Sequence, residues 1–436
     1  MLTLTGNRRS QDCDGHTRRD FLRIGTLGAG AVTLPGLLQA RAEAAASGLA
    51  SKNTSVIWVW LSGGPTHVET FDPKMSAPVE YRSTTGEVKT NLPGVTLGGN
   101  FERFAKIADK MAFFRSFAHT NSGHGGGTHY LMTGYDNRNI DNGGLPSRPS
   151  LGSITSRIRG ANHPVSGMPT YVRLNSIGSD GPAFLGTAYA PFGTNREAKQ
   201  NMDLRTSLER VGDRRSLLAD FDRFNRTADA SGVMDGLDAF EKQAFNLVLG
   251  NAPKAFDLNA EDPRTRDRYR EAGSFGDQLL IARRLCEAGC GFVTLNYGGW
   301  DMHGNVQKSM NSRGPVVDRG VAALIEDIYQ RGLSENILVV VTGEFGRTPR
   351  INRNAGRDHW APLSTLALAG GGFRMGQVIG ESDSKASRPA SKRIGPQDLM
   401  ATIFNLLGFD PKTQFHNQAG RPVNLIEEGR VITELV

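Results

Sequence analysis

The sequence of 436 residues has few cysteines, and it lacks both a long apolar run and a block of basic residues. Its three cysteines are too few for the disulfide framework of a small secreted domain. The apolar run that ends at Leu38 is broken by glycines and a proline and is shorter than the ~20 residues of a spanning helix, so no stable transmembrane span is expected. The net charge of +7 is spread along the chain, which argues against a nucleic-acid partner.

The N-terminal segment has the pattern of a twin-arginine secretion signal. Arg18 and Arg19 precede the apolar run to Leu38, and small residues at 42–46 offer cleavage sites. We therefore expect residues 1–46 to direct the protein through the twin-arginine export machinery to the periplasm or the medium. An amphipathic helix and an uncleaved membrane anchor are the alternative interpretations. Without this segment the net charge is +5.

Two cysteines remain after the N-terminal segment. Cys286 and Cys290 lie one helical turn apart on a face that also carries apolar residues. Such spacing suits packing better than bridging, so we expect buried free thiols rather than a disulfide or a zinc site.

Apolar, β-rich segments alternate with segments of helical spacing in the rest of the chain. The expected strands are residues 56–61, 111–117, 169–175, 291–299, 336–346 and 363–372. The expected helices are residues 101–109, 274–288, 316–331 and 396–407. This alternation is typical of a doubly wound, mostly parallel sheet with helices on both faces, and we expect one α/β domain over residues 47–436.

The pattern changes in residues 178–270, where polar sequence rich in arginine and aspartate replaces the strands. Its helical spacing predicts a helical insertion over the sheet. Residues 380–393 are rich in serine and lysine, a composition that predicts a flexible loop.

Unusual polar residues follow four of the expected strands, at residues 62–72, 119–129, 298–305 and 343–348. Ligands of open α/β sheets bind outside the carboxyl ends of the strands. The sequence therefore predicts a functional site at that edge of the sheet.

Asp301 and His303 are the best local pair of metal ligands. Residues two apart in an extended segment point the same way, so one carboxylate and one imidazole share a face. Such a pair makes a half-site for zinc or another divalent ion. A salt-bridged pair in a loop is an equally good interpretation.

Glu344 ends a nearly continuous apolar strand, where a carboxylate costs desolvation free energy unless it meets a cation. The cation is either Arg347 or a metal ion. His359 follows Asp358 in a loop before another strand, and a solvated loop pair is the alternative there.

Three consecutive glycines, Gly125–Gly127, stand between His124 and His129 at the expected start of a helix. If these histidines face the crevice, the glycines let backbone N–H groups approach an anion at the helix N-terminus, with the hydroxyl of Ser122 in reach. A tight turn is the simpler explanation of the glycine run.

Together with the twin-arginine leader, four motifs resemble the family called domain of unknown function 1501. They are LSGGPTHVETFDPK, GHGGGTHYLMTGY, GGWDMHGN and TGEFGRTPRIN followed by GRDHW. The resemblance covers nearly all of the chain after the leader. Members of that family are often labelled sulfatase-like, and the family is regarded as a distant branch of the alkaline phosphatase and sulfatase superfamily. The resemblance implies an alkaline phosphatase-like α/β fold with an ester hydrolase site of one or two metal ions.

The superfamily's metal ligands carry over only in part. Asp301, His303 and the late histidine, His359, match one metal site, although the gap between the first two is shorter than usual. The Asp-His pair of the other site falls on Glu344 and Phe345. The aspartate expected after the first strand falls on serine or glycine at 62–63, with Asp72 or His67 as substitutes.

The resemblance also bears on catalysis. The superfamily's nucleophile falls near His124, so Ser122 is the nearest hydroxyl. The resemblance implies a metal-dependent hydrolase of phosphate or sulfate esters. Its metal ion would be zinc, manganese or calcium, held by Asp301, His303, Glu344 and His359. Ser122 or a water would attack, His124 or His129 would act as general acid or base, and Arg347 would hold the oxyanion.

The substrate implied is a small anionic ester or a sulfated or phosphorylated glycan. The departures from the superfamily pattern leave a second interpretation, an exported binding or assembly protein that keeps the crevice without turnover.

Export is expected to depend on Arg18 and Arg19. Replacing both by Lys should remove the protein from the periplasmic fraction, because the export machinery reads the arginine pair. The same replacement at Arg8 and Arg9 also keeps the positive charges but lies outside the pair, so it serves as the control. Undiminished periplasmic protein in the first variant would contradict the assignment. In the wild type, mass spectrometry should find the mature N-terminus between Ala42 and Leu49.

Overall fold

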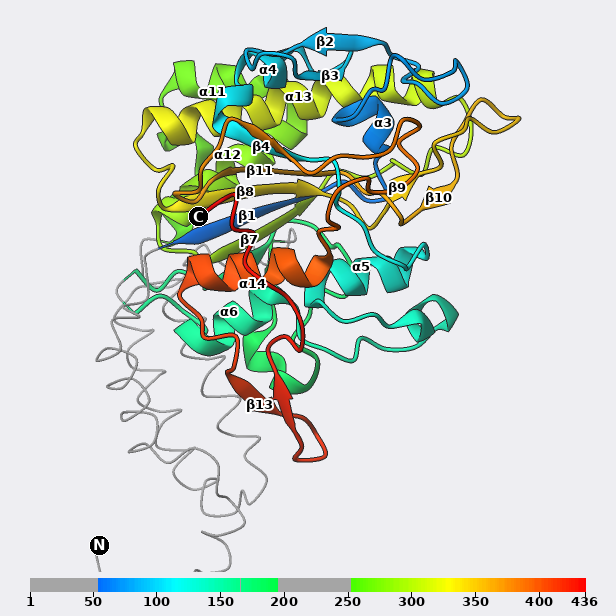
Figure 1. Ribbon diagram of the computed structural model, residues 1–436. Coiled ribbons are helices and arrows are strands. Elements are labelled where there is room, and N and C mark those ends of the chain that lie inside the picture. The colour runs from blue at the N-terminus through cyan, green and yellow to red at the C-terminus, as the bar shows by residue number, and fades with distance from the viewer. Residues whose placement is uncertain (1–53, 165, 195–251) are drawn as a thin grey trace, which may run out of the picture. The chain divides into compact units, whose positions relative to one another are not determined.

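The computed structural model of the protein describes residues 54–164, 166–194 and 252–436. The expected secretion signal and the middle of the expected helical insertion lie outside the described residues. The centre of the fold is an eight-stranded sheet in the order β12-β4-β11-β8-β1-β7-β5-β6 (Figure 1). Its strands are β1 (Ser55–Trp60), β4 (Met111–Phe114), β5 (Tyr171–Arg173), β6 (Phe192–Gly193), β7 (Phe292–Asn296), β8 (Ile337–Thr342), β11 (Leu366–Gly370) and β12 (Gln377–Ile379).

The sheet is mostly parallel, as predicted. Only β11 departs from the common direction, because it runs antiparallel to both of its neighbours, β4 and β8. The remaining neighbours pair in parallel. All six expected strands are present, although most are shorter than expected, and the sequence pattern did not reveal the short edge strands β6 and β12.

Helices cover both faces of the sheet (Figure 1). One face carries α4 (Glu102–Lys106), α11 (Pro263–Arg270), α12 (Gly273–Glu287) and α13 (Val306–Gln330), and the other carries α5 (His124–Thr133), α6 (Leu151–Arg159) and α14 (Pro396–Leu407). The shorter helices are α3 (His67–Thr70) and α10 (Ala252–Phe256). No helix of the described residues is long and apolar enough to cross a membrane.

The central strand β1 shows why its sequence is apolar at every position. Its side chains alternate between two separate hydrophobic clusters, one on each face of the sheet. Ile57 and Val59 pack in the cluster that contains α12 and α13, whereas Trp58 and Trp60 pack in the cluster that contains α14. Both faces are therefore buried, as expected for a strand in the middle of a two-sided sheet.

The helix predictions differ in how well their ends match. α14 begins and ends where expected, because Pro396 occupies its first turn and Gly408 ends it in the left-handed conformation. α13 begins at Val306, ten residues before the predicted start at residue 316. The helix continues through Pro315, which sequence reasoning treats as a boundary.

Three two-stranded sheets lie beside the main sheet. They are β2 (Glu87–Lys89) with β3 (Thr96–Gly98), β9 (Gly346–Arg347) with β10 (His359–Trp360), and β13 (Gln414–His416) with β14 (Pro422–Asn424). Both cysteines of the described residues are buried and free, as expected, and burial raises the pKa of the Cys290 thiol to about 12.

A buried network of charges joins α11, α12 and α13. Arg283 of α12 is 1 % exposed, and its guanidinium contacts Glu261, Glu287 and Asp327. Asp327 of α13 also accepts a hydrogen bond from the hydroxyl of Tyr269 at 2.9 Å. The carboxylates together compensate the buried arginine, so removing one leaves part of its charge uncompensated in a buried place.

Asp327→Asn should lower the free energy of unfolding by about 3–5 kcal/mol, the usual cost of breaking a buried ion pair from one side. Asp267→Asn is the matched control, because the Asp267–Arg270 pair lies on the surface with side chains 63 % and 61 % exposed. It should cost below about 1 kcal/mol. Urea unfolding measures both variants, and equal losses would contradict the role of the network.

Candidate metal centre

The carboxyl ends of β1, β7 and β8 lie at one edge of the sheet, on the right of Figure 1. Polar side chains from five segments meet there. They are His124 at the start of α5, Asp301 and His303 after β7, Glu344 after β8, Arg347 in β9 and His359 in β10. The edge predicted from sequence is therefore where these residues gather.

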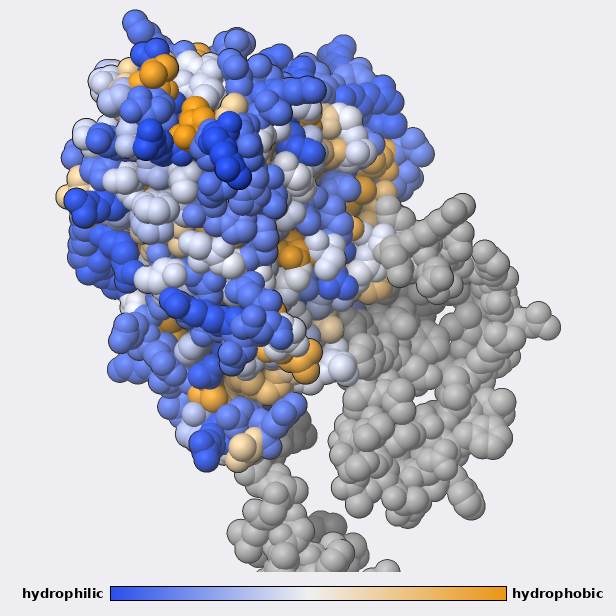
Figure 2. Space-filling model, turned by 90° about the vertical axis from the view of Figure 1, so that its right-hand side faces the viewer, coloured by the Kyte–Doolittle hydropathy of each residue, from blue (hydrophilic) through white to orange (hydrophobic). Residues whose placement is uncertain are grey.

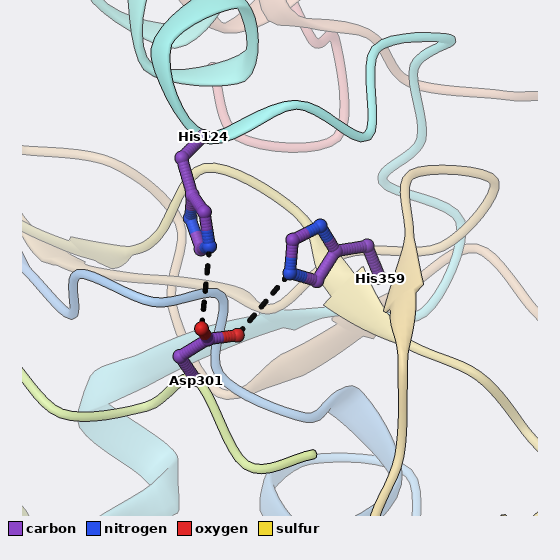
Figure 3. A group of neighbouring side chains, drawn as sticks. All are labelled: His124, Asp301 and His359. Carbon is purple, nitrogen blue, oxygen red and sulfur yellow. Dashed lines mark hydrogen bonds and ion pairs between the residues drawn. The ribbon is translucent and has the colours of Figure 1, made fainter. Parts of the chain in front are cut away.

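Two overlapping triads share Asp301 and His359. In the first, His124 Nε2 lies 3.5 Å from Asp301 Oδ2, and His359 Nε2 lies 3.2 Å from Asp301 Oδ1 (Figure 3). The possible ligand atoms of this triad lie within 4.8 Å of one another. In the second, His303 Nε2 lies 3.0 Å from Asp301 Oδ1 and 3.1 Å from His359 Nε2.

The outer nitrogen of each imidazole is held by an oxygen. His124 Nδ1 lies 2.7 Å from Glu344 Oε1, and His303 Nδ1 lies 2.7 Å from Asp358 Oδ1. His359 Nδ1 lies 2.9 Å from the carbonyl oxygen of Ser122. Ionised carboxylates and carbonyls only accept hydrogen bonds, so each Nδ1 is the donor.

A neutral imidazole that donates through Nδ1 has a lone pair on Nε2. When neutral, His124, His303 and His359 therefore turn lone pairs toward the Asp301 carboxylate. The Arg347 guanidinium contacts that carboxylate from another side, and a proton or a metal ion between the rings would relieve the repulsion among the lone pairs. The spacing also suits a metal. Ligand bonds of about 2.0–2.1 Å in a tetrahedron place ligand atoms about 3.3 Å apart, close to the separations around Asp301 Oδ1.

Asp301 is held by Arg347. The guanidinium of Arg347 lies 2.5 Å from Asp301 Oδ1. Burial alone raises the pKa of the Asp301 carboxyl, but the hydrogen bond and charge of Arg347 outweigh it and lower this pKa to about 2. The Asp301 carboxylate therefore stays ionised at neutral pH.

Arg347 itself is fully buried and engaged with protein atoms. Besides Asp301, it donates hydrogen bonds to the carbonyl oxygens of Gly63, Gly64 and Arg357. These contacts tie together the loops after β1 and β7 and the segment before β10. Arg347 therefore holds these segments together, and the N–H groups of its guanidinium donate to oxygen atoms of the protein.

Glu344 lies behind His124, on the side away from Asp301. Its side chain is 3 % exposed, and Oε1 accepts hydrogen bonds from His124 Nδ1 and from the Gly63 N–H group, each at 2.7 Å. The hydrogen bond that His124 donates to Glu344 is the largest cause of the raised pKa of His124. The structure therefore pairs Glu344 with an imidazole and a backbone N–H group, where the sequence predicted Arg347 or a metal ion.

The glycine run in the first turn of α5 binds a carboxylate of the same chain. The N–H groups of Gly125 and Gly126 donate to Asp141 Oδ1 at 2.8 and 3.1 Å. A Cβ at Gly126 would overlap Asn121 Nδ2 and lie 2.7 Å from Asp141 Oδ2, so a larger residue would displace these side chains. The anticipated anion at the helix N-terminus is thus a side chain, and sequence reasoning missed it because Asp141 lies beyond the helix.

The remaining predicted residues lie around the cluster or outside it. Ser122 accepts a hydrogen bond from the N–H group of Ala361 at 3.1 Å. His129 is buried, and its ring nitrogens lie 2.7 Å from the Tyr135 carbonyl and 3.3 Å from the Ser147 N–H group. The structure therefore separates His129 from Asp301 and its neighbours.

His67 and Asp72 contact other parts of the chain. His67 Nε2 lies 2.9 Å from the Ala386 carbonyl. Asp72 pairs with Lys74 at 3.4 Å and with Arg115 at 3.3 Å. Neither residue therefore occupies the position directly after β1 where the resemblance predicts an aspartate.

The cluster is open to solvent. The side chains of His124 and Asp301 are 44 % and 46 % exposed. The face that carries this edge of the sheet is mostly hydrophilic over its described residues (Figure 2). A polar molecule can therefore reach the cluster without displacing a hydrophobic cover.

The ion pair of Asp301 with Arg347 should make stability depend on pH at low pH. The folded pKa of about 2 lies below the ~3.9 of an unfolded Asp, so the stabilisation is complete above pH ~4 and is lost as the pH falls through about 2. Urea unfolding with a chelator should find wild type more stable than Asp301→Asn at pH 5, with the difference closing toward pH 2. A difference independent of pH would contradict this.

Solved structures give distant matches. The lipoteichoic acid synthase LtaP of Listeria monocytogenes is 10% identical, with 87% of this chain and 76% of that chain covered and a TM-score of 0.38. The PsFucS1 sulfatase of Pseudoalteromonas sp. is 12% identical, with coverages of 84% and 70% and a TM-score of 0.39. The C-terminal periplasmic domain of EcEptC of Escherichia coli, in complex with Zn, is 11% identical, with coverages of 89% and 93% and a TM-score of 0.36.

Likenesses at this level assign no activity to the chain. Among curated proteins, none matches the sequence. The family described as "Protein of unknown function (DUF1501)" matches residues 53–436, which is nearly the whole chain after the N-terminal segment. The protein therefore belongs to the DUF1501 family.

Proposed function

We propose that the protein is an exported, metal-dependent hydrolase of phosphate or sulfate esters, with Asp301, His303 and His359 holding one divalent ion. The observation that carries the proposal is the convergence of two Nε2 lone pairs on one oxygen of an ionised carboxylate, at 3.0 to 3.2 Å. A divalent cation converts this repulsive arrangement into a set of three ligands. Three protein ligands with an open position are typical of catalytic zinc sites.

The donor set favours zinc over calcium and manganese. Two imidazole nitrogens and one carboxylate suit zinc, whereas calcium takes six or more oxygen ligands and manganese prefers carboxylate, carbonyl and water. Asp358 and the Ser122 carbonyl hold the outer nitrogens of His303 and His359, as the outer partners of zinc-binding histidines commonly do.

A bound metal ion would polarise an ester oxygen and lower the pKa of an attacking water. The protein residues would provide orientation and proton transfer. Arg347 keeps Asp301 ionised and in place. His124 is the general acid or base, because its Nε2 faces Asp301 and the hydrogen bond from its Nδ1 to Glu344 raises its pKa.

The engaged states of Ser122 and Arg347 favour attack by water over attack by serine. The Ser122 hydroxyl faces a backbone N–H group, and the Arg347 donors face protein oxygens. Stabilisation of charge on the substrate would therefore depend on the metal ion and on His124. The open, hydrophilic surroundings fit a small anionic ester or the charged group of a glycan.

The alternative is a binding or assembly protein without turnover. His124 supports it, because its Nε2 also faces Asp301, in the triad drawn in Figure 3. If His124 binds the ion together with the other three residues, the site is closed by four protein ligands, as in structural zinc sites. The role of His124 thus separates the two functions.

His124→Ala is the decisive variant. An enzyme in which His124 transfers protons should lose hydrolysis of aryl phosphate or aryl sulfate by about 100-fold or more while its zinc affinity stays within a few-fold of wild type. Loss of zinc affinity with no hydrolysis in wild type would instead support the binding protein. Isothermal titration with zinc and a chromogenic ester assay measure the two properties.

The control variants address the metal site itself. Asp301→Ala with His359→Ala should abolish zinc binding, whereas His416→Ala on the exposed β13 should leave it unchanged. Metal analysis of purified wild type should find about one equivalent of metal. Zinc binding by the double variant at wild-type affinity would overturn the proposed site.

A further inference from the structure

Several backbone hydrogen bonds link the two loops that carry the proposed histidine ligands. The Arg357 N–H group donates to the Met302 carbonyl at 2.9 Å. The N–H groups of Asn305 and Val306 donate to carbonyl oxygens at 354 and 355, at 3.0 and 2.8 Å. These backbone contacts hold the loop after β7 against the loop that leads into β10.

Asn352 sits between the two loops and uses both ends of its side-chain amide. Its oxygen accepts hydrogen bonds from the N–H groups of Asn354 and Gly356, at 2.9 and 3.0 Å. Its nitrogen donates to the His303 carbonyl at 3.1 Å and to Asp358 Oδ1 at 3.2 Å. The opposite orientation of the amide would set its oxygen against two oxygens, so the contacts fix which end faces which loop.

These contacts hold His303 at two points. Asn352 binds the His303 backbone directly, and it also binds Asp358, whose Oδ1 holds the His303 ring through Nδ1 at 2.7 Å. The first contact holds the His303 backbone in place, and the second restrains the rotation of its ring. Both determine where Nε2 points.

Gly356 makes the close approach of the loops possible. A Cβ at this position would overlap the carbonyl group of His303 and the N–H group of Gly304. Both obstacles are backbone atoms, so no side-chain rotation relieves the overlap. The loops can approach to hydrogen-bonding distance only with glycine here.

We infer that Asn352 is a positioning residue of the metal site, which sets His303 for the ion through its backbone and through Asp358, while Gly356 permits the contact. The inference rests on the proposed metal site and adds residues that touch neither metal nor substrate. It explains how His303 keeps one orientation although its side chain is 46 % exposed.

Asn352→Asp is the sharpest test. Aspartate keeps the oxygen that accepts from the loop's own N–H groups, but it loses the donor and turns a carboxylate toward Asp358 and the His303 carbonyl. Zinc affinity should fall about tenfold, as for other residues that orient a ligand. Arg353→Ala, on the exposed part of the same loop, is the control and should bind zinc as wild type does.

A second measurement separates positioning from a merely structural role. Thermal unfolding with and without zinc gives the increase in melting temperature that the ion provides, and this increase should shrink in Asn352→Asp. Equal lowering of both melting temperatures, with unchanged zinc affinity, would overturn the inference.

Asp358→Asn provides an independent route, because Asp358 is 52 % exposed and its replacement keeps the side-chain shape. It should also weaken zinc binding, and its effect should not add to that of Asn352→Asp, because both act through His303. Strictly additive effects would overturn the chain of contacts. If wild type binds zinc but both variants bind it equally well, only the positioning role fails, whereas a wild type that binds no zinc refutes the metal site as well.

Discussion

The ion pair between Arg347 and Asp301 is the contact on which the rest of the site depends. Arg347 is buried among carbonyl oxygens from the loops after β1 and before β10, and Asp301 supplies the charge that compensates it. The same carboxylate is the centre around which His303 and His359 gather. One buried cation thus fixes the position of the anion that a metal ion would share.

Most of the fold could be predicted because its strongest patterns are local. β1 is apolar at every position since it packs on both sides, and α14 carries its own start and stop residues. The failures have equally physical causes. The early start of α13 depends on tertiary packing that tolerates Pro315, and β12 is three residues long, too short for any periodicity.

The site was predictable at the level of the sheet edge and less so at the level of atoms. The spacing of Asp301 and His303 predicts that the two side chains share one face, and their contact at 3.0 Å agrees with it. The role of Glu344 depends on which imidazole reaches its oxygen across more than 200 residues of sequence, which no local pattern reveals. The role of Asn352 could not be predicted either, because asparagine is common in loops and only the folded structure shows which groups its side-chain amide contacts.

The antiparallel direction of β11 determines at which edge of the sheet His359 lies. Asp301 and Glu344 follow their strands, but His359 precedes the strand β11. In a wholly parallel sheet, a residue that precedes a strand would enter at the far edge, about 17 Å away for a strand of five residues. Because β11 is antiparallel to its neighbours, it begins at the edge of the sheet where β7 and β8 end. His359, which precedes β11, therefore lies at the same edge as the residues that follow β7 and β8. The antiparallel strand is thus a requirement of the site and not an irregularity of the sheet.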